Sequence, residues 1–118
     1  MTKILMHHIG IETTDMEKSI KLFEACGAFV SNKVEAKSID KTLVFMTSAG
    51  TTIELISSDQ DRLAQVAYLT RHVENIPFDI KTADKVLYIP EIEKVCYFFE
   101  NESIEYMIPA VASSYVHP

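Results

Sequence analysis

The sequence contains no tryptophan, only two cysteines among its 118 residues, and no excess of positive charge. The absence of Trp argues against a site that stacks a large planar ligand. Cys26 and Cys96 are too few for a disulfide framework, and each lies at or near the end of a predicted apolar helix face. We expect both to be reduced packing residues. The net charge of −6 argues against nucleic acid or an anionic membrane as the main partner, because both need a basic face.

The sequence also has no long apolar run. None approaches the roughly 20 residues of a membrane-spanning helix, and the N-terminus lacks a hydrophobic signal core followed by a cleavage site. We therefore expect a cytoplasmic protein whose residues 1–118 form a single domain. A chain of this length buries about two-thirds of its unfolded surface. The partners that remain are small molecules or proteins.

Two segments of the chain resemble each other: residues 15–24 recur as residues 91–100. Four residues of the first segment find identical partners in the second: Glu17, Lys18, Phe23 and Glu24. Each segment follows a short apolar run that is typical of a strand. The pattern predicts a degenerate tandem duplication, in which a cleft between the halves would draw its residues from equivalent positions of both.

The first half predicts a β-α-β-β-β module over about residues 3–57. Residues 14–17 form a capping-box pattern, and Gly27 supplies a left-handed stop, so we expect a helix over about 15–26. Three β-prone runs follow Gly27, at 29–35, 42–47 and 51–57. The last two are joined by a short turn at Ser48-Ala49-Gly50.

The second half predicts a shorter module. Leu63, Val66, Ala67 and Thr70 lie on one helical face, which indicates a linker helix over about 59–73. A degenerate second module then follows over about 78–112. Its expected elements are extended runs at 78–82 and 84–89, a helix at 90–101 and a strand at 104–108.

Strand alternation predicts which residues face a common site. In the opening strand, Ile9 and Ile11 share the apolar face that a helix must cover, so His8, Gly10 and Glu12 face the other way. The same rule places Glu54 of the run 51–57 on the uncovered face. His7 and His8 point to opposite faces, so they cannot bind one ion together. A His and a Glu therefore converge on one face.

At these residues the sequence resembles the vicinal oxygen chelate superfamily, which includes glyoxalase I, methylmalonyl-CoA epimerase, extradiol dioxygenases and bleomycin-resistance proteins. It is most similar to the epimerase and glyoxalase branch. The likeness is good over residues 5–57 and weak over 84–111. It rests on three motifs: His8-Ile9-Gly10-Ile11, Asp15-Met16-Glu17-Lys18 and Ile53-Glu54-Leu55.

The resemblance implies an α+β fold in which paired βαβββ modules form a cup-shaped mixed sheet around a divalent metal. His8 and Glu54 match the ligand positions of the first module. A neutral imidazole and a carboxylate suit Mn, Co, Ni, Fe or Zn, and open coordination positions let a substrate bind through vicinal oxygens. Glu54 itself or Glu12 is placed to move the substrate proton.

The second module departs from the family pattern. The repeat maps His8 to Asp84 and maps Glu54 beyond the end of the chain. Asp84 is therefore a candidate ligand or a surface turn residue, and His72 and His117 are further candidates or exposed side chains. A neighbouring subunit can also complete the site, because missing strands leave an open sheet edge. We expect a homodimer.

Two functions remain open. The first is a metal-dependent lyase or isomerase that removes a proton next to a carbonyl of a small substrate. The second is a metal-free binding protein on the same scaffold, as in bleomycin-resistance proteins; His8 is then a hydrogen-bonded strand residue and Glu54 a solvated one. A regulatory βαβ module explains the repeat, but it gives no reason for this His and Glu. The enzyme is our preferred interpretation.

Overall fold

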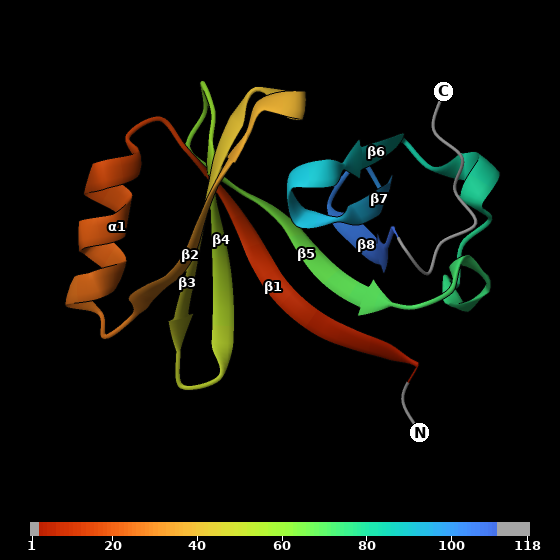
Figure 1. Cartoon of the computed structure of the whole chain (residues 1–118), viewed down its shortest axis with the longest axis horizontal. Coiled ribbons are helices and arrows are strands. Elements are labelled where there is room, and N and C mark those ends of the chain that lie inside the picture. Colours follow the sequence, from red (N-terminus) through yellow and green to blue (C-terminus); the bar gives the residue numbers. More distant parts are fainter. Residues whose placement is uncertain (1–2, 111–118) are drawn as a thin grey trace. The chain divides into compact units, whose positions relative to one another are not determined.

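The computed structural model describes residues 3–110 and has the predicted α+β architecture (Figure 1). The described chain divides into two compact units, and each is considered by itself. The first unit holds residues 8–64, and the second unit holds residues 3–7 together with 65–110. Within residues 3–110, no helix is long and apolar enough to cross a membrane.

The first unit contains the predicted β-α-β-β-β module. Its elements are β1 (Ile4–Thr13, here from His8 onward), α1 (Met16–Ala25), β2 (Phe29–Ala36), β3 (Lys41–Ser48) and β4 (Thr51–Ser57). The strands lie in the order β2-β3-β4-β1. β1 is parallel to β4, and the other neighbours are antiparallel. The three strands predicted after Gly27 are thus confirmed to within one residue at each end.

Local interactions at both ends set the length of α1. Asp15 is the N-cap, and its carboxylate accepts a hydrogen bond from the Lys18 amide at 3.1 Å. The capping role predicted for Thr14 is wrong. Its amide and hydroxyl donate to the Asp61 carboxylate, and they hold the pKa of Asp61 below its usual value. After the helix, Gly27 has φ +97°, the predicted left-handed stop.

α1 packs on one face of this sheet (Figure 1). Three apolar strand residues form the buried core: Val44, Met46 and Leu55. The stripe predicted on the helix packs against them: Met16, Ile20 and Phe23. Ile11 and Ile53 join the same cluster, as the alternation predicted. Each fully buried side chain of this kind contributes roughly 1.5–3 kcal/mol to stability. His8 and Glu54 alternate with these apolar residues along their strands, so they lie on the opposite face of the sheet.

The second unit repeats this strand pattern. It contains β5 (Arg62–Thr70, here from Gln65 onward), β6 (Lys85–Ile89), β7 (Lys94–Phe99) and β8 (Ile104–Pro109). The order is β5-β8-β7-β6, with β5 parallel to β8 and the other neighbours antiparallel. Four strands are present, so the shortening of this module lies outside the strands. Among the described residues, the second unit has no counterpart of α1.

The helices predicted over 59–73 and 90–101 are wrong. The first segment contains β5, and the second forms a 3-10 turn at Pro90–Ile92 followed by β7. Both strands bury residues on both of their faces, so their apolar residues do not alternate with polar ones. Short apolar runs of this kind cannot be told from helix by their periodicity alone. Residues 62–70 therefore belong to the strands and form no linker helix.

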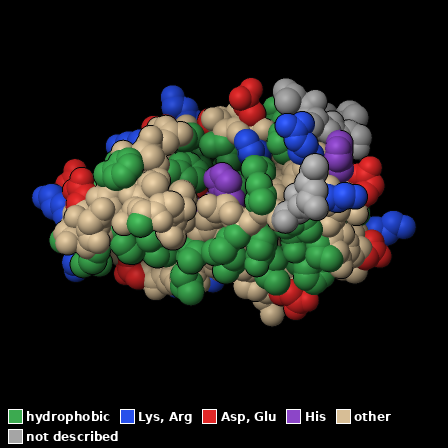
Figure 2. Space-filling model, turned by 90° about the horizontal axis from the view of Figure 1, so that it is seen from below, with side chains coloured by type: hydrophobic (Ala, Val, Ile, Leu, Met, Phe, Trp, Pro, Cys, Tyr) green, Lys and Arg blue, Asp and Glu red, His purple; other side chains and the backbone are tan. Residues whose placement is uncertain are grey.

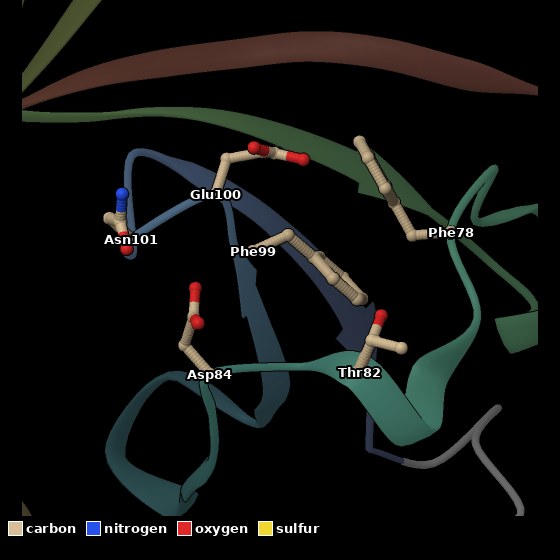
Figure 3. A pocket seen from close by; sticks show the side chains of 6 residues that line it. All are labelled: Phe78, Thr82, Asp84, Phe99, Glu100 and Asn101. Carbon is tan, nitrogen blue, oxygen red and sulfur yellow. The ribbon is translucent and has the colours of Figure 1, made fainter.

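A stretch without an α-helix covers one face of the second unit. It contains two 3-10 turns, Val73–Asn75 and Ile80–Thr82; the extended run predicted at 78–82 is wrong over the second turn. Phe78 of this stretch stacks on Phe99 of β7, with ring centroids 4.8 Å apart. Figure 3 shows the two rings side by side. Aromatic packing thus covers the face that a helix covers in the first unit.

The internal repeat has a different register from the predicted one. Ile39-Asp40-Lys41 leads into β3, and Ile92-Glu93-Lys94 leads into β7. In each stretch the acidic residue is the C-cap of a 3-10 turn, and its backbone is in the left-handed conformation. Asp40 has φ 55° and Glu93 has φ 54°. Residues 91–100 are therefore equivalent to the region around β3, and their likeness to the helix at 15–24 does not extend to structure.

Candidate functional site

The face of the first sheet that α1 leaves uncovered holds His8 and Glu54 side by side. β1 and β4 pair in parallel with Gly10 opposite Glu54, and His8 lies two residues before Gly10 on the same face. The distance from His8 Nε2 to Glu54 Oε1 is 3.2 Å, and their side chains are 1% and 8% exposed. The prediction that this His and Glu share one face is confirmed.

An aromatic ring closes this pair from one side. Phe45 of β3 is the strand partner of Glu54, and its ring meets the His8 imidazole edge to face, with centroids 5.8 Å apart and planes at 88°. Water is largely displaced from this part of the face, and charge interactions are stronger in a drier environment. The ring and the strand pairing hold the imidazole against the carboxylate.

The second unit contains an equivalent pair that the sequence analysis missed. β5 and β8 pair in parallel with Ala67 opposite Glu105, as Gly10 lies opposite Glu54 in the first unit. Gln65, two residues before Ala67, donates a hydrogen bond from Nε2 to Glu105 Oε1 at 3.3 Å. Gln65 and Glu105 are both buried. The strand partner of Glu105 in β7 is Phe98, in the position that Phe45 occupies beside Glu54.

These registers correct the expected equivalences. Gln65, rather than Asp84, is the counterpart of His8, and Glu105 is the counterpart of Glu54, which had been mapped beyond the end of the chain. The signal for Glu105 was present in the sequence, because Ile104-Glu105 resembles Ile53-Glu54. Gln65 gives no such signal, because a glutamine inside an apolar run has no spacing that marks it as a ligand.

Asp84 has a local role in the second unit. Its carboxylate accepts a hydrogen bond from the Glu102 amide at 3.0 Å, and its own amide donates to the Phe98 carbonyl at 2.7 Å. Figure 3 shows Asp84 beside Glu100 and Asn101 around a small cavity. It thus stabilises the turn between β7 and β8, which is the surface alternative considered for this residue.

The remaining candidates lie elsewhere. His72 is exposed and begins the turn Val73–Asn75, and His117 is outside the described residues. Glu12 is on the same face of β1 as His8, as predicted, but both of its carboxylate oxygens have partners. Oε1 accepts a hydrogen bond from the Ser58 hydroxyl at 2.6 Å, and Oε2 lies 2.6 Å from Arg62 Nη2.

The buried donors are of the kind that binds a divalent cation. His8, Glu54 and Glu105 are buried, and each offers one ligand atom, an imidazole nitrogen or a carboxylate oxygen. Imidazole suits Zn, Fe and Ni, and carboxylates suit Mn, Mg and Ca. His8 and Glu54 of the first unit therefore could contribute to a metal site, and Glu105 is a donor of the same kind in the second unit.

The face of the molecule shown in Figure 2 carries charges of both signs. On the face shown in Figure 2, Lys and Arg side chains are interspersed with Asp and Glu. Among the described residues drawn there, the basic side chains form no continuous patch of the kind that nucleic acid needs.

Comparison with known proteins gives structural matches only. No protein-family model matches the sequence, and no curated protein matches it. Three solved structures of methylmalonyl-CoA epimerases match the chain with low sequence identity. The enzyme from Mycobacterium tuberculosis has a TM-score of 0.66 and 13% identity, covering 89% of this chain and 87% of its own.

The other two epimerase structures cover the chain almost completely. A variant of the Streptomyces coelicolor enzyme in complex with 2-nitronate-propionyl-CoA has a TM-score of 0.69 and 18% identity, covering 97% of this chain and 100% of its own. A methylmalonyl-CoA epimerase in complex with methylmalonyl-CoA and ammonium has a TM-score of 0.69, 17% identity and the same coverage. The chain therefore has the fold of the methylmalonyl-CoA epimerases, as the resemblance to that branch of the vicinal oxygen chelate superfamily implied.

Proposed function

We propose that this protein is a metal-dependent isomerase or lyase that removes the proton next to the carbonyl of a small acyl thioester. The observation that carries the proposal is the buried contact between His8 and Glu54, on the face of the sheet that α1 leaves uncovered. Burying a carboxylate and an imidazole costs free energy that apolar residues would not cost. That cost indicates that the pair serves a role other than packing.

The donor set fits a divalent metal. His8 and Glu54 of the first unit are the proposed ligands. One imidazole and one carboxylate suit the divalent metals considered above. A bound metal polarises the substrate carbonyl and lowers the cost of negative charge on its oxygen.

The protein's own carboxylates supply the proton transfer. Glu12 is a weaker candidate for the base than the sequence suggested, because both of its oxygens already have partners. Glu54 is buried beside His8, and a carboxylate in a fixed position can act as a general base. We propose that Glu54 accepts the proton and returns it to the substrate.

The fold supports the choice of substrate class. The two epimerase structures with ligands hold a propionyl-CoA derivative and methylmalonyl-CoA. An acyl-CoA thioester is therefore the first substrate to test. We also propose that the protein is cytoplasmic.

We also propose a homodimer. β2 lies at the edge of its sheet, and most of its residues are exposed, so its unpaired backbone groups are available to a second chain. Light scattering after gel filtration tests this expectation. A mass of one chain at all concentrations contradicts it.

One observation favours a metal-free binding protein instead. The 3.2 Å contact lets His8 and Glu54 partner each other directly, so their burial has an explanation without any ion. In that case the face binds a small ligand by shape and sequesters it, and no proton is exchanged.

Metal analysis and proton exchange together decide between the two functions. We expect about one metal ion per chain in the wild type, lost in His8→Ala and Glu54→Ala. Glu35→Gln, which changes an exposed carboxylate, serves as the matched control and should retain the metal. Glu54→Gln keeps a ligand oxygen but cannot accept a proton.

Exchange of the substrate α-proton with deuterated solvent, followed by NMR on methylmalonyl-CoA, provides the second readout. If Glu54 is the base, Glu54→Gln lowers the exchange rate by about 10²–10⁴-fold. A wild type that binds a thioester but holds no metal and exchanges no proton contradicts the enzyme and supports the binding protein.

A further inference from the structure

Arg62 is held in place by a largely buried carboxylate. Its Nη2 atom lies 2.6 Å from Glu12 Oε2, and the side chain of Glu12 is 15% exposed whereas that of Arg62 is 48% exposed. The other oxygen of Glu12 accepts a hydrogen bond from the Ser58 hydroxyl at 2.6 Å. Ser58 in turn is fixed at the end of β4, because its amide donates to the Thr13 carbonyl at 2.9 Å. A rigid carboxylate thus orients a guanidinium that is half in solvent.

This arrangement lies on the face that carries His8 and Glu54. Glu12 is two residues after Gly10, the strand partner of Glu54. Two residues along a strand span about 6.6 Å and neighbouring strands lie about 4.8 Å apart, so the Cα atoms of Glu12 and Glu54 are about 8 Å apart. That separation is about the length of a short acyl group with a charged end.

The chemistry of the group fits an anion. A guanidinium offers five N–H donors in a planar fork, and the contact with Glu12 uses one nitrogen. The remaining donors match the paired oxygens of a carboxylate or a phosphate. A half-exposed ion pair contributes little to stability by itself, so stability alone does not explain why Glu12 is buried to hold it.

We propose that Arg62, oriented by Glu12 and Ser58, binds an anionic group of the substrate, a carboxylate or a phosphate, and so positions the substrate beside His8 and Glu54. Glu12 is then a positioning residue and not a carrier of the proton. The identity of the substrate rests on the proposed function, whereas the recognition of an anion by Arg62 does not.

Calorimetry with two thioesters identifies the anionic group. Methylmalonyl-CoA carries a free carboxylate on its acyl chain, and propionyl-CoA does not. If Arg62 binds that carboxylate, Arg62→Ala weakens the binding of methylmalonyl-CoA by about 10–100-fold and leaves that of propionyl-CoA unchanged. If it binds a phosphate of the CoA portion, both affinities fall alike. Equal affinities of wild type and variant for both thioesters overturn the proposal.

Two further variants separate orientation from charge. Arg62→Lys keeps the charge without the fork and should recover only part of the lost affinity. Glu12→Gln should raise KM more than it lowers kcat, because it loosens Arg62 without removing it. A Glu12→Gln variant that loses kcat at unchanged KM identifies Glu12 as the base and overturns its positioning role.

NMR provides a test that needs neither metal nor thioester. The chain has only two arginines, Arg62 and Arg71, so two side-chain Nε–H signals are expected, and Arg71→Lys assigns them. Titration of the chelator-treated protein with malonate and with phosphate should shift the Arg62 signal saturably. Arg71, which is exposed, is the internal control. Equal shifts of both signals, or none, overturn the proposal, and a selective shift in a protein that binds no metal leaves it standing while the metal proposal fails.

Discussion

Replacing His8 and Glu54 by leucine, singly and together, tests whether the pair is kept for function. The two side chains are 1% and 8% exposed and lie 3.2 Å apart. His8→Leu leaves the Glu54 carboxylate in a buried position without its imidazole. Glu54→Leu does the same to the imidazole. The double variant His8→Leu/Glu54→Leu removes both polar groups and fills the site with apolar atoms.

The three variants have different expected stabilities. Removing one partner of a buried pair lowers the free energy of unfolding by about 3–5 kcal/mol, because the other partner keeps its desolvation cost. Replacing both by apolar residues of similar volume is neutral or raises it by about 1–4 kcal/mol. The double variant should therefore be at least about 3 kcal/mol more stable than either single variant. With a urea dependence of about 1–3 kcal/mol per molar for a small protein, the midpoints differ by at least about 1 M.

Urea unfolding of the chelator-treated proteins, followed by far-ultraviolet circular dichroism, measures these differences. Tyrosine fluorescence is a second probe, since the chain has no tryptophan. One outcome is a double variant that does not bind metal and yet is at least as stable as the wild type. That result shows that the pair serves binding at the expense of stability. A double variant as unstable as the worse single variant refutes this reasoning, because the pair is then needed for folding.

Three further predictions concern the rest of the structure. Burial raises the pKa of Tyr106 above its usual value of 10.0. The contribution of Tyr106 to stability is therefore constant below pH 10 and is lost as the pH rises through the higher folded pKa. Ultraviolet titration of the wild type and of Tyr106→Phe measures the pKa of this side chain. The Thr14 amide and hydroxyl lower the pKa of Asp61 from 3.8, so Thr14→Val should raise it part of the way back in a carboxyl NMR titration, and the stability that depends on it is lost as pH falls through the folded pKa. Phe99 is 2% exposed, so Phe99→Ala should lower the free energy of unfolding by about 3–5 kcal/mol. Val86 is exposed, so Val86→Ala should lower it by under about 1 kcal/mol. Urea unfolding measures both.

Much of the first unit could be predicted because its signals are local. The stop at Gly27 depends on one residue, and the apolar stripe Met16, Ile20 and Phe23 repeats at the helical spacing. The opening strand alternates, so the faces of Ile11 and His8 follow from the pleat. The sequence therefore indicated both His8 and Glu54 before their contact was known.

The second unit was predicted less well because its signals depend on long-range pairing. Residues 62–70 and 94–99 bury both faces, so neither shows the alternation that marks a strand. Without β5 and β7, the parallel partner of β8 could not be identified, and Glu105 had no counterpart. The likeness between residues 15–24 and 91–100 then favoured an alignment of the two halves in which Asp84 was the equivalent of His8.

The sequence by itself determined the α+β class, the module over residues 8–57 and the side of the sheet on which His8 and Glu54 lie. Those features follow from capping residues and from periodicities that a few neighbouring residues carry. Only the tertiary structure decided that Gln65 and Glu105 repeat the pair of the first unit and that Glu12 holds Arg62. Strand pairing and side-chain contacts join residues that are distant along the chain, and no local pattern records which strands will become neighbours.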